Sequence, residues 1–225
     1  MLSGFQTDEV DFLSLLNETN RRLVLENSTK TEYLPGALAY HPEMPPRAFV
    51  LDRGLARAYV SVPDGRQATC TFAHSRELIG GTTIVSHPPR IVIQVVIKST
   101  LTILDLPRVQ KLAAAESQVT MAVAMHLAAL VRTAFRLIAV RTLGDIEQRL
   151  AYDLLDRACR TQLEVGRLEA RATHADLADS IGSAREVVGR TLGRLREQGI
   201  VETAPSLVRV IDPLRLAGIV RAFAF

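Results

Sequence analysis

Three charged side chains lie close together in the segment REVVGR, at residues 185–190. Arg185, Glu186 and Arg190 are spaced so that a helix would present them on one side of its first two turns. An arginine can donate two parallel hydrogen bonds to O6 and N7 of guanine, and a glutamate can accept one from N4 of cytosine. The spacing therefore predicts a helix that reads base edges in the major groove of DNA.

The surrounding residues predict the helix-turn-helix that would position these side chains. A first helix is expected from about His174 to Ser180, and Gly182 stands where the chain must reverse, since glycine adopts positive φ angles without a Cβ penalty. Ser183 is expected to open the second helix, which meets base edges with its N-terminal residues. The apolar residues of this second helix recur at the spacing of one buried face: Val187, Val188, Leu192 and Leu195.

An alternative interpretation of the same residues involves no DNA. Ser183 and Glu186 have the spacing of a capping box, in which Glu186 would only return to the backbone amide of Ser183. Arg185 and Arg190 would then be solvated arginines of an ordinary surface helix. We favour DNA reading because the turn, the caps, the apolar spacing and the placement of charge all agree with it.

The composition restricts the class of protein. A chain of 225 residues, of which 48% are hydrophobic, is long enough for one or two compact cores. Aromatic residues make up 5% and tryptophan is absent, which argues against a binder of carbohydrate or single-stranded nucleic acid that stacks its ligand on aromatic rings. The net charge of +3 and the pI of about 9.1 permit nucleic-acid binding without requiring it.

Cysteine usage and the N-terminal residues indicate the compartment. Cys70 and Cys159 are too few for a disulfide framework. The first residues, MLSGFQTDEVDF, lack the basic-then-apolar pattern of a signal peptide. No uninterrupted apolar run reaches the roughly 18 residues of a membrane span. We therefore expect a soluble cytoplasmic protein without a membrane partner.

A β-rich region is expected between Tyr33 and Leu106, after a helical lead-in at residues 5–30. Turn residues separate its short β-prone runs, which predicts an antiparallel sandwich or roll. Pro63-Asp64-Gly65-Arg66 is expected to form a hairpin turn. The run at Ile91–Ile97 is almost wholly apolar, which predicts a strand buried on both faces. The expected strands are Phe49–Leu51, Ala58–Val62, Ala68–Phe72, Ile91–Ile97 and Leu101–Leu104.

Beyond Pro107 the pattern is helical for more than thirty residues. Five apolar residues follow one another at spacings of 4, 3, 4 and 3, which is the a/d seam of a coiled coil and predicts a homodimer. A second stripe, at Val131, Phe135 and Ile138, would pack against the β-rich domain of the same chain. The alternative is a single long helix packed only on its own domain. The residues of the expected seam are Val123, Leu127, Leu130, Ala134 and Leu137.

A hinge is expected at residues 142–145, where Gly144 ends the long helix and Asp145 caps the next one, from Ile146 to about Cys159. After Gly199, the two β-prone runs Ile200–Glu202 and Leu207–Val210 predict a wing, and Asp212-Pro213 caps a last helix. The expected domains are a β-roll sensor at 1–112, a dimerisation helix with hinge at 113–143, and a winged helix-turn-helix at 144–225.

This order of parts resembles the Crp/Fnr family of bacterial transcription regulators over essentially the whole chain. The matching strings are FVLDRGLARAYVSVPDGRQATCTF at 49–72, ELIGG at 77–81 and REVVGR at 185–190. The resemblance implies an α+β fold with an antiparallel β-roll like that of cyclic-nucleotide-binding domains, a double-stranded β-helix. It also implies a homodimer that binds double-stranded DNA, and RNA polymerase as a further partner if the protein is an activator.

The resemblance also assigns roles to residues of the helix-turn-helix. In the family the matching Arg, Glu and Arg read half-sites of the TGTGA kind in an inverted repeat, so Arg185, Glu186 and Arg190 take those roles by resemblance. Thr173 and Ser183, at the helix starts, would hold phosphate oxygens.

The sensor half departs from the cyclic-nucleotide members. Those members place a glutamate directly after the glycine of the strand turn, whereas here Gly81 follows Gly80. They hold the cyclic phosphate with an arginine followed by Ser or Thr, whereas here Ile91 follows Arg90. The effector pocket implied by resemblance therefore lacks two of its polar partners.

The long helix departs in the same way, because Ala134 and Phe135 stand where those members offer hydroxyls to adenine. Each polar partner lost leaves a buried group unsatisfied, at a cost of about 1–3 kcal/mol. We therefore expect a sensor that is degenerate for cAMP, with another effector or none.

The cysteine and histidine residues restrict the other possible cofactors. Two cysteines cannot hold an iron–sulfur cluster of four cysteine ligands. Haem stays open, because each of four histidines carries an imidazole able to bind iron. A cAMP- or haem-responsive member of the family is the alternative function. A cupin-like metalloenzyme is disfavoured, because no His-x-His pair with a spaced Glu occurs, and no metal site or catalytic residue is expected. The four histidines are His41, His74, His87 and His126.

Overall fold

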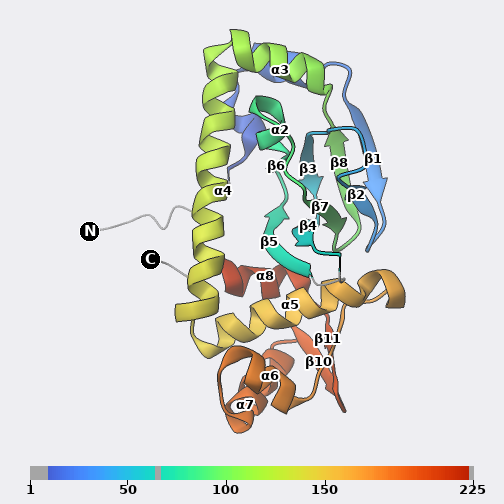
Figure 1. Ribbon diagram of the computed structural model, residues 1–225, viewed down its shortest axis with the longest axis vertical. Helices are drawn as coiled ribbons and strands as arrows, with labels where there is room; N and C mark the ends of the chain where they lie inside the picture. Colours follow the sequence, from blue (N-terminus) through green and yellow to red (C-terminus); the bar gives the residue numbers. More distant parts are fainter. Residues whose placement is uncertain (1–9, 64–66, 223–225) are drawn as a thin grey trace, which may run out of the picture. The chain divides into compact units, whose positions relative to one another are not determined.

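The computed structural model describes residues 10–63 and 67–222 (Figure 1), which form two compact units. The first unit contains the residues up to Leu34 together with Leu38–Thr133, and the second contains Pro35–Ala37 and the residues from Ala134 onward. The division falls within one long helix, α4 (Ser117–Leu143), ten residues before the helix ends. Each unit has its own core and is described separately.

The first unit is built on two four-stranded sheets whose strand pairs are all antiparallel. This arrangement confirms the α+β fold with an antiparallel β-roll. The first sheet contains, in spatial order, β1 (Thr29–Tyr33), β8 (Ser99–Ile103), β3 (Phe49–Arg53) and β6 (Leu78–Ile79). The second contains β2 (Leu38–Tyr40), β7 (Val92–Val95), β4 (Leu55–Ser61) and β5 (Gln67–His74).

Alternating apolar residues of the two sheets meet in one cluster, which includes Phe49 and Leu101 from the first sheet and Ala58 and Ile93 from the second. Burial of these side chains is the main favourable contribution to the fold of this unit. All four residues of β7 are buried, which confirms the expected strand with two buried faces. β4 pairs with β5 from Leu55↔His74 to Ser61↔Gln67, and the expected turn between them includes residues 64–66, which lie outside the described residues.

Three strands of the first unit were not expected from the sequence. β1 (TKTEY) lies at an edge of its sheet and has no buried residue, so it carries no apolar alternation to detect. β2 and β6 are only three and two residues long. The helical lead-in is also shorter than expected, because a 3-10 helix η1 (Phe12–Leu15) and helix α1 (Glu18–Leu25) are followed by β1.

Helices pack against the first sheet in a second cluster, to which Phe12, Val24, Val109 and Val123 belong. The expected continuous helix beyond Pro107 is two helices, α3 (Leu106–Ala115) and α4. They are separated at Glu116, whose extended backbone (ψ 105°) closes α3. The short helix α2 (Gly81–Val85) precedes them. The expected dimerisation helix at 113–143 is therefore wrong at its start, because Ala113 belongs to α3.

Among the described residues, α4 is the one helix that is long and apolar enough to cross a membrane, with a mean hydropathy of 1.6 over its most apolar window. The sequence expectation overlooked it because His126 and Arg132 interrupt its apolar run. An apolar helix that packs on its own domain and on a partner meets the same criteria. Length and composition alone therefore do not indicate a membrane.

The second unit contains the last ten residues of α4 and continues into the next helix. Asp145 caps α5 (Ile146–Val165) in a capping box with Gln148, whose amide donates to the Asp145 carboxylate at 2.8 Å. This confirms the expected break and cap after Gly144. α5 extends beyond Cys159, where the sequence predicted its end. Its C-cap residue is Gly166, which has a left-handed φ of 68°. Its buried residues include Leu150, Leu154 and Leu155.

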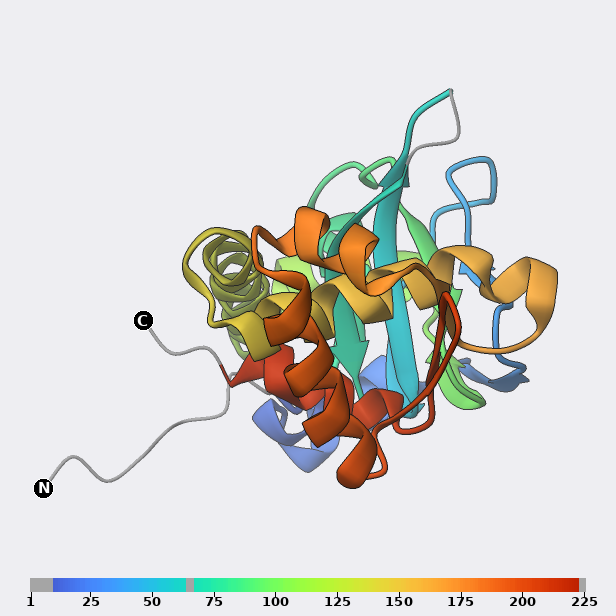
Figure 2. The same cartoon turned by 90° about the horizontal axis from the view of Figure 1, so that it is seen from below.

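The remaining elements of the second unit form a winged helix-turn-helix, seen from below in Figure 2. A three-stranded antiparallel sheet in the order β10-β11-β9 makes the wing, of which β9 was not expected. The elements are β9 (Glu169–Arg171), α6 (His174–Ile181), α7 (Arg185–Glu197), β10 (Val201–Ala204), β11 (Leu207–Val210) and α8 (Pro213–Arg221).

Candidate nucleic-acid interface

The helix-turn-helix consists of α6, a three-residue turn and α7. Gly182 has φ 61° and ψ 53°, and the amide of Ser183 donates to the carbonyl of Ala178 at 2.9 Å. These are the features of a glycine C-cap, in which the left-handed residue lets the chain reverse and satisfy the last carbonyls of the helix. The expected turn at Gly182 is therefore confirmed.

The start of α7 differs from the sequence expectation. α7 begins at Arg185 with Ala184 as its N-cap residue, and no side chain caps it. Ser183 lies one position too early, since its amide bonds back to α6 as part of the glycine cap. The alternative capping box between Ser183 and Glu186 is therefore not formed, and Glu186 is not needed to satisfy the backbone.

One face of α7 is fixed in the core of the unit. Val188, Leu192 and Leu195 are buried, and Thr191 donates its hydroxyl to the carbonyl of Val187 at 3.0 Å. The buried positions therefore follow the expected helical spacing, with Thr191 added and Val187 only half-buried.

The opposite face of α7 carries Arg185, Glu186 and Arg190, all of which are exposed. Within the described residues, none of these three side chains forms a hydrogen bond or an ion pair. The helix therefore offers two guanidinium groups and one carboxylate at its N-terminal end with their hydrogen-bonding groups free for a ligand.

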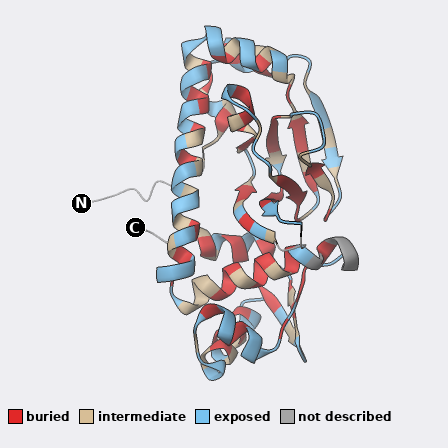
Figure 3. Cartoon of the chain, in the orientation of Figure 1, coloured by how far each residue is buried: buried red, intermediate tan, exposed pale blue. Residues whose placement is uncertain are grey.

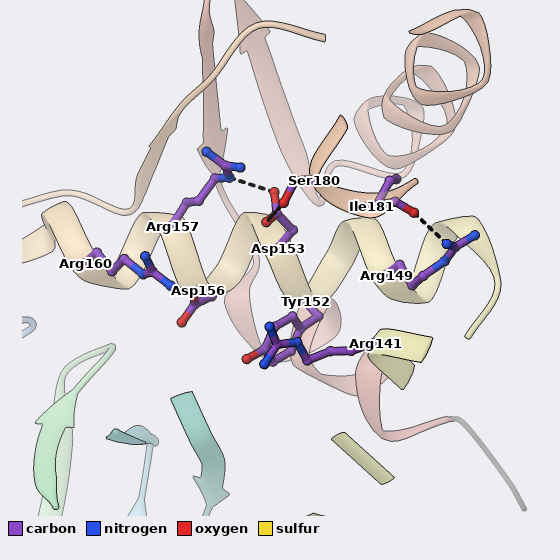
Figure 4. A pocket seen from close by; sticks show the side chains of 9 residues that line it. All are labelled: Arg141, Arg149, Tyr152, Asp153, Asp156, Arg157, Arg160, Ser180 and Ile181. Carbon is purple, nitrogen blue, oxygen red and sulfur yellow. Dashed lines mark hydrogen bonds and ion pairs between the residues drawn. The ribbon is translucent and has the colours of Figure 1, made fainter. Parts of the chain in front are cut away.

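Side chains of α5 contact both helices of the helix-turn-helix, and Figure 4 shows the two contacts with α6. The guanidinium of Arg149 donates from Nη1 to the carbonyl oxygen of Ile181 at 2.5 Å, at the end of α6. The hydroxyl of Ser180 donates to Asp153 Oδ1 at 2.7 Å. A positive charge at the C-terminal end of α6 also interacts favourably with the helix dipole.

A third contact joins α5 to α7, because Glu147 on α5 pairs with Arg194 on α7 at 3.0 Å. No local spacing in the sequence marks Glu147, Arg149 or Asp153. Each of them bonds to a residue that is distant along the chain. Their arrangement fixes the turn from which the recognition helix starts.

Thr173 has a structural role in the described fold. Its hydroxyl accepts from the amide of Asp176 at 3.1 Å and donates to the carboxylate of Asp176 at 2.8 Å. The hydrogen bond from the Thr173 amide, followed by that from its hydroxyl, lowers the pKa of Asp176. Because its one hydroxyl proton is already used, Thr173 caps α6 rather than presenting a donor to a phosphate oxygen.

The two glycines of the expected effector pocket lie at the turn between β6 and α2. Gly80 has a left-handed φ of 84°, and a Cβ there would lie 2.6 Å from the carbonyl oxygen of Arg47. A Cβ on Gly81 would lie 2.8 Å from Cδ2 of His126 on α4. The imidazole of His126 therefore occupies the space that a side chain at position 81 would need.

The other expected pocket residues are less enclosed. Arg90 is exposed in the segment before β7, and Ile91 is half-buried. Ala134 and Phe135 are exposed on α4, with Phe135 58% accessible. His126 is thus buried beside Gly81, whereas Arg90 is exposed.

Burial lowers the pKa of His126 from 6.5 to about 4. Between pH 4 and 6.5 the unfolded chain binds more protons than the folded chain, so the free energy of unfolding rises with pH. The contribution of the neutral imidazole is fully present above the unfolded pKa of 6.5 and is lost as the pH falls toward about 4. The difference between the two pKa values corresponds to about 3 kcal/mol in the free energy of unfolding, of which about 2 kcal/mol is lost by about pH 5. We expect urea unfolding to report that loss for the native chain.

The variant His126→Leu is expected to remove most of this pH dependence, because leucine does not titrate. His87→Gln, at an exposed histidine, serves as the control and should retain the dependence. The same pH dependence in His126→Leu as in the native chain would contradict this account of the buried imidazole.

The other three histidines considered as haem ligands lie at separate places in the first unit: His41 follows β2, His74 ends β5 and His87 follows α2. His126 is packed against Gly81. Within the described residues, no group of three or more His, Cys, Asp or Glu side chains is arranged to hold a metal ion.

The expected seam of α4 is wrong in its register. Val123 is 1% exposed and belongs to the core cluster of the first unit, while Leu137 is 7% exposed, so both are covered by their own chain. Leu127 and Leu130 are half-buried, and only Ala134 is exposed. A side chain already buried in its own chain cannot supply a dimer seam.

A different set of α4 residues is exposed along the helix (Figure 3). These residues recur at spacings of 3, 4, 3, 4 and 3, the spacing of a coiled-coil seam. They include Val131, Phe135 and Ile138, which the sequence assigned to packing within the chain. We name the set the outer stripe: Met121, Ala124, Ala128, Val131, Phe135 and Ile138.

Comparison with known proteins agrees with the geometry of the second unit. Residues 148–219, which include α6, the turn and α7, match the Crp-like helix-turn-helix domain. The chain carries a Crp-like DNA-binding domain. The expected resemblance to the Crp/Fnr family is thereby confirmed for the helix-turn-helix segment.

A curated relative of this chain is the transcriptional regulator SdrP of Thermus thermophilus. The two are 30% identical over 92 residues, which is 40% of this chain and 45% of SdrP. The matched segment therefore spans less than half of that relative.

Solved structures resemble the fold over most of the chain. A putative Crp/Fnr family regulator from Eubacterium rectale has a TM-score of 0.58 and 21% identity, covering 92% of this chain and 96% of that one. FixK2 from Bradyrhizobium japonicum has a TM-score of 0.53 and 21% identity, covering 88% and 99%. The c-di-GMP-responsive regulator CLP from Xanthomonas campestris has a TM-score of 0.52 and 18% identity, covering 83% and 95%.

Proposed function

We propose that this Crp/Fnr-type chain is a cytoplasmic regulator that binds double-stranded DNA in a sequence-specific way as a homodimer. The single observation that carries the proposal is the exposed, unpaired set of Arg185, Glu186 and Arg190 at the N-terminal end of α7. Side chains at this end of a recognition helix reach base edges in the major groove. Contacts from α5 support the proposal, because they would hold the helix in a fixed orientation.

The chemistry of the three side chains favours G·C pairs. Each arginine matches the O6 and N7 acceptors of guanine, and the carboxylate of Glu186 matches the N4 donor of cytosine. By resemblance to the family, the half-site is TGTGA-like and the full site is an inverted repeat. Ser183, at the turn, is the proposed phosphate contact, and Thr173 is not proposed for that role.

A second copy of the chain is the proposed partner of the outer stripe. Its spacing suits another helix with the same stripe, and a two-fold arrangement brings identical residues together. Phe135 and Ile138 are 58% and 61% exposed, so pairing would remove large apolar side chains from water. Two recognition helices would then have to lie about 34 Å apart to enter successive major grooves.

We propose that DNA binding does not require cAMP. His126 fills the space beside Gly81, and Arg90 lies exposed, so the residues favour a sensor that takes another effector or none. No cofactor is proposed. If the protein activates transcription, RNA polymerase is a further partner.

A binding titration tests the proposal. The full chain is added to a labelled duplex with a TGTGA inverted repeat, and to a scrambled duplex of equal length and composition. Specific proteins bind their sites about 10³-fold or more tightly than other sequences, so a ratio of that order is expected at moderate salt. Equal affinity for the two duplexes would contradict sequence-specific binding by this chain.

A further inference from the structure

The DNA reader, by which we mean α6, the turn and α7, contains one helix whose start has no side-chain cap. α6 begins with a capping box between Thr173 and Asp176, whereas the N-cap residue of α7 is Ala184, whose methyl group cannot accept a hydrogen bond. An uncapped start leaves the first N–H groups of a helix without a local side-chain partner. The direction in which α7 leaves the turn therefore has to be set by contacts from other elements.

Arg149 on α5 lies directly against this turn. Its Nη1 donates to the carbonyl oxygen of Ile181 at 2.5 Å, and lies 3.7 Å from the position that a Cβ on Gly182 would take. The amide of the next residue, Ser183, is used in the glycine cap of α6. One guanidinium thus contacts the two residues at which the chain leaves α6 for α7.

One N–H group of the same guanidinium is left unsatisfied. Nε of Arg149 is buried and has no hydrogen-bond partner among the described residues. A buried donor without a partner costs free energy, and such local conflicts are expected where a residue serves function. The position of this side chain is therefore explained better by the carbonyl that it reaches than by its own hydrogen bonding.

The other end of α7 is held from α8. Arg215 donates from Nη1 to the carbonyl oxygen of Gln198, the C-cap residue of α7, at 2.9 Å. The amide of Arg215 donates to the carboxylate of Asp212 at 3.0 Å, so the same residue belongs to the start of α8. A positive charge suits this place, because the last carbonyls of a helix carry the negative end of its dipole.

We propose that Arg149 and Arg215 are positioning residues, which hold the two ends of α7 from outside that helix and so set the base preference of the reader. This inference rests on the proposed function, because it concerns how α7 meets DNA. Bidentate hydrogen bonds from Arg185 to a base tolerate little displacement, so a shift in the first turn of α7 weakens them. Arg149 has the larger effect, since it lies at the end of α7 that meets the bases.

Titrations with the TGTGA inverted repeat and the scrambled duplex test this role. Arg149→Met keeps an unbranched apolar stem and removes the guanidinium. We expect it to lower the ratio of the two affinities about tenfold, the effect of one lost charge-assisted hydrogen bond. Arg215→Met should lower the ratio by about threefold, because its bond is exposed and distant from the bases.

Arg160→Met is the matched control. It removes an equal charge from α5, at a side chain whose hydrogen bond within the described part of the chain is to Asp156 on the same helix. Its affinity ratio should equal that of the native chain. A lowered thermal midpoint of Arg149→Met with an unchanged affinity ratio would show a purely structural role and overturn the proposal.

Hydrogen exchange on the full chain without DNA separates this role from the proposed function. The amide of Ser183, bonded to the carbonyl of Ala178 at 2.9 Å, reports opening of the turn. We expect Arg149→Met to speed its exchange about tenfold and Arg160→Met to leave it unchanged. Unchanged exchange in Arg149→Met would overturn the positioning role. Equal binding of both duplexes by the native chain would overturn the proposed function instead, while faster exchange would still support the hold of Arg149 on the turn.

Discussion

Replacing Arg185 with alanine is expected to reduce affinity for a TGTGA inverted-repeat duplex by about ten- to hundredfold per half-site. The reason is the loss of a bidentate contact to guanine, which is worth about 1–3 kcal/mol of base discrimination. Because Arg185 is exposed and unpaired, the fold should not change. Fluorescence anisotropy with the intact site and with sites altered at one base pair measures both the affinity and the lost preference.

Arg196→Ala is the matched control, since Arg196 is exposed on the same helix but lies near its C-terminal end. It removes the same charge and should weaken all duplexes equally without changing base preference. Preserved sequence preference in Arg185→Ala would sink the role assigned to this side chain. A lowered thermal midpoint would instead indicate a structural role.

Replacing Phe135 with glutamate is expected to turn a dimer into a monomer. The change places a charge within the outer stripe of both copies, where pairing would bury it without a partner. We expect the dimer dissociation constant to rise at least about a hundredfold, as for loss of a large aromatic hot-spot residue at an interface. Sedimentation equilibrium measures the constant directly.

Val85→Glu is the control for this experiment, because Val85 on α2 is similarly exposed, at 53% against 58% for Phe135, but lies outside the outer stripe. Its dissociation constant should match that of the native chain. A native chain that is monomeric, or a Phe135→Glu dimer of unchanged strength, would contradict the pairing of outer stripes. Binding of the native chain to lipid vesicles that Phe135→Glu abolishes would instead assign the stripe to a membrane.

The helix-turn-helix could be predicted from the sequence because its signals are local. Gly182, the apolar positions of α7 and the three charged residues all lie within about four turns of helix. Over that length, the spacing of residues along the chain determines which side chains share a helix face. The start of α7 was placed one residue early, because Ser183 is a good capping residue by type. Its backbone is instead used in the glycine cap of α6.

The long helix was harder to interpret because both of its apolar stripes have helical spacing. The sequence cannot tell which stripe faces its own domain, since that depends on contacts between α4 and residues such as Phe12 and Val109 that lie far away in the chain. Val123 is buried in that cluster, so the stripe that contains Val123 faces the domain of its own chain. Edge strand β1 was missed for a related reason, because an exposed strand has no apolar alternation.

The sensor was predicted to be degenerate for cAMP from missing polar residues, and the structure adds a steric reason. His126 takes the space beside Gly81, so restoring a glutamate at position 81 would require the imidazole to move. The contacts of Glu147, Arg149 and Asp153 with the reader could not be foreseen, because each joins residues that are distant in sequence.

The central claim is that two copies of α7 read two half-sites without cAMP. Its most direct test compares the affinity of the native chain for the TGTGA inverted repeat with that for a repeat whose half-sites are moved apart by about half a helical turn. Each titration is run with and without cAMP. The account predicts tight binding to the first duplex only, unchanged by cAMP. Binding that ignores the spacing, or that depends strongly on cAMP, would contradict it.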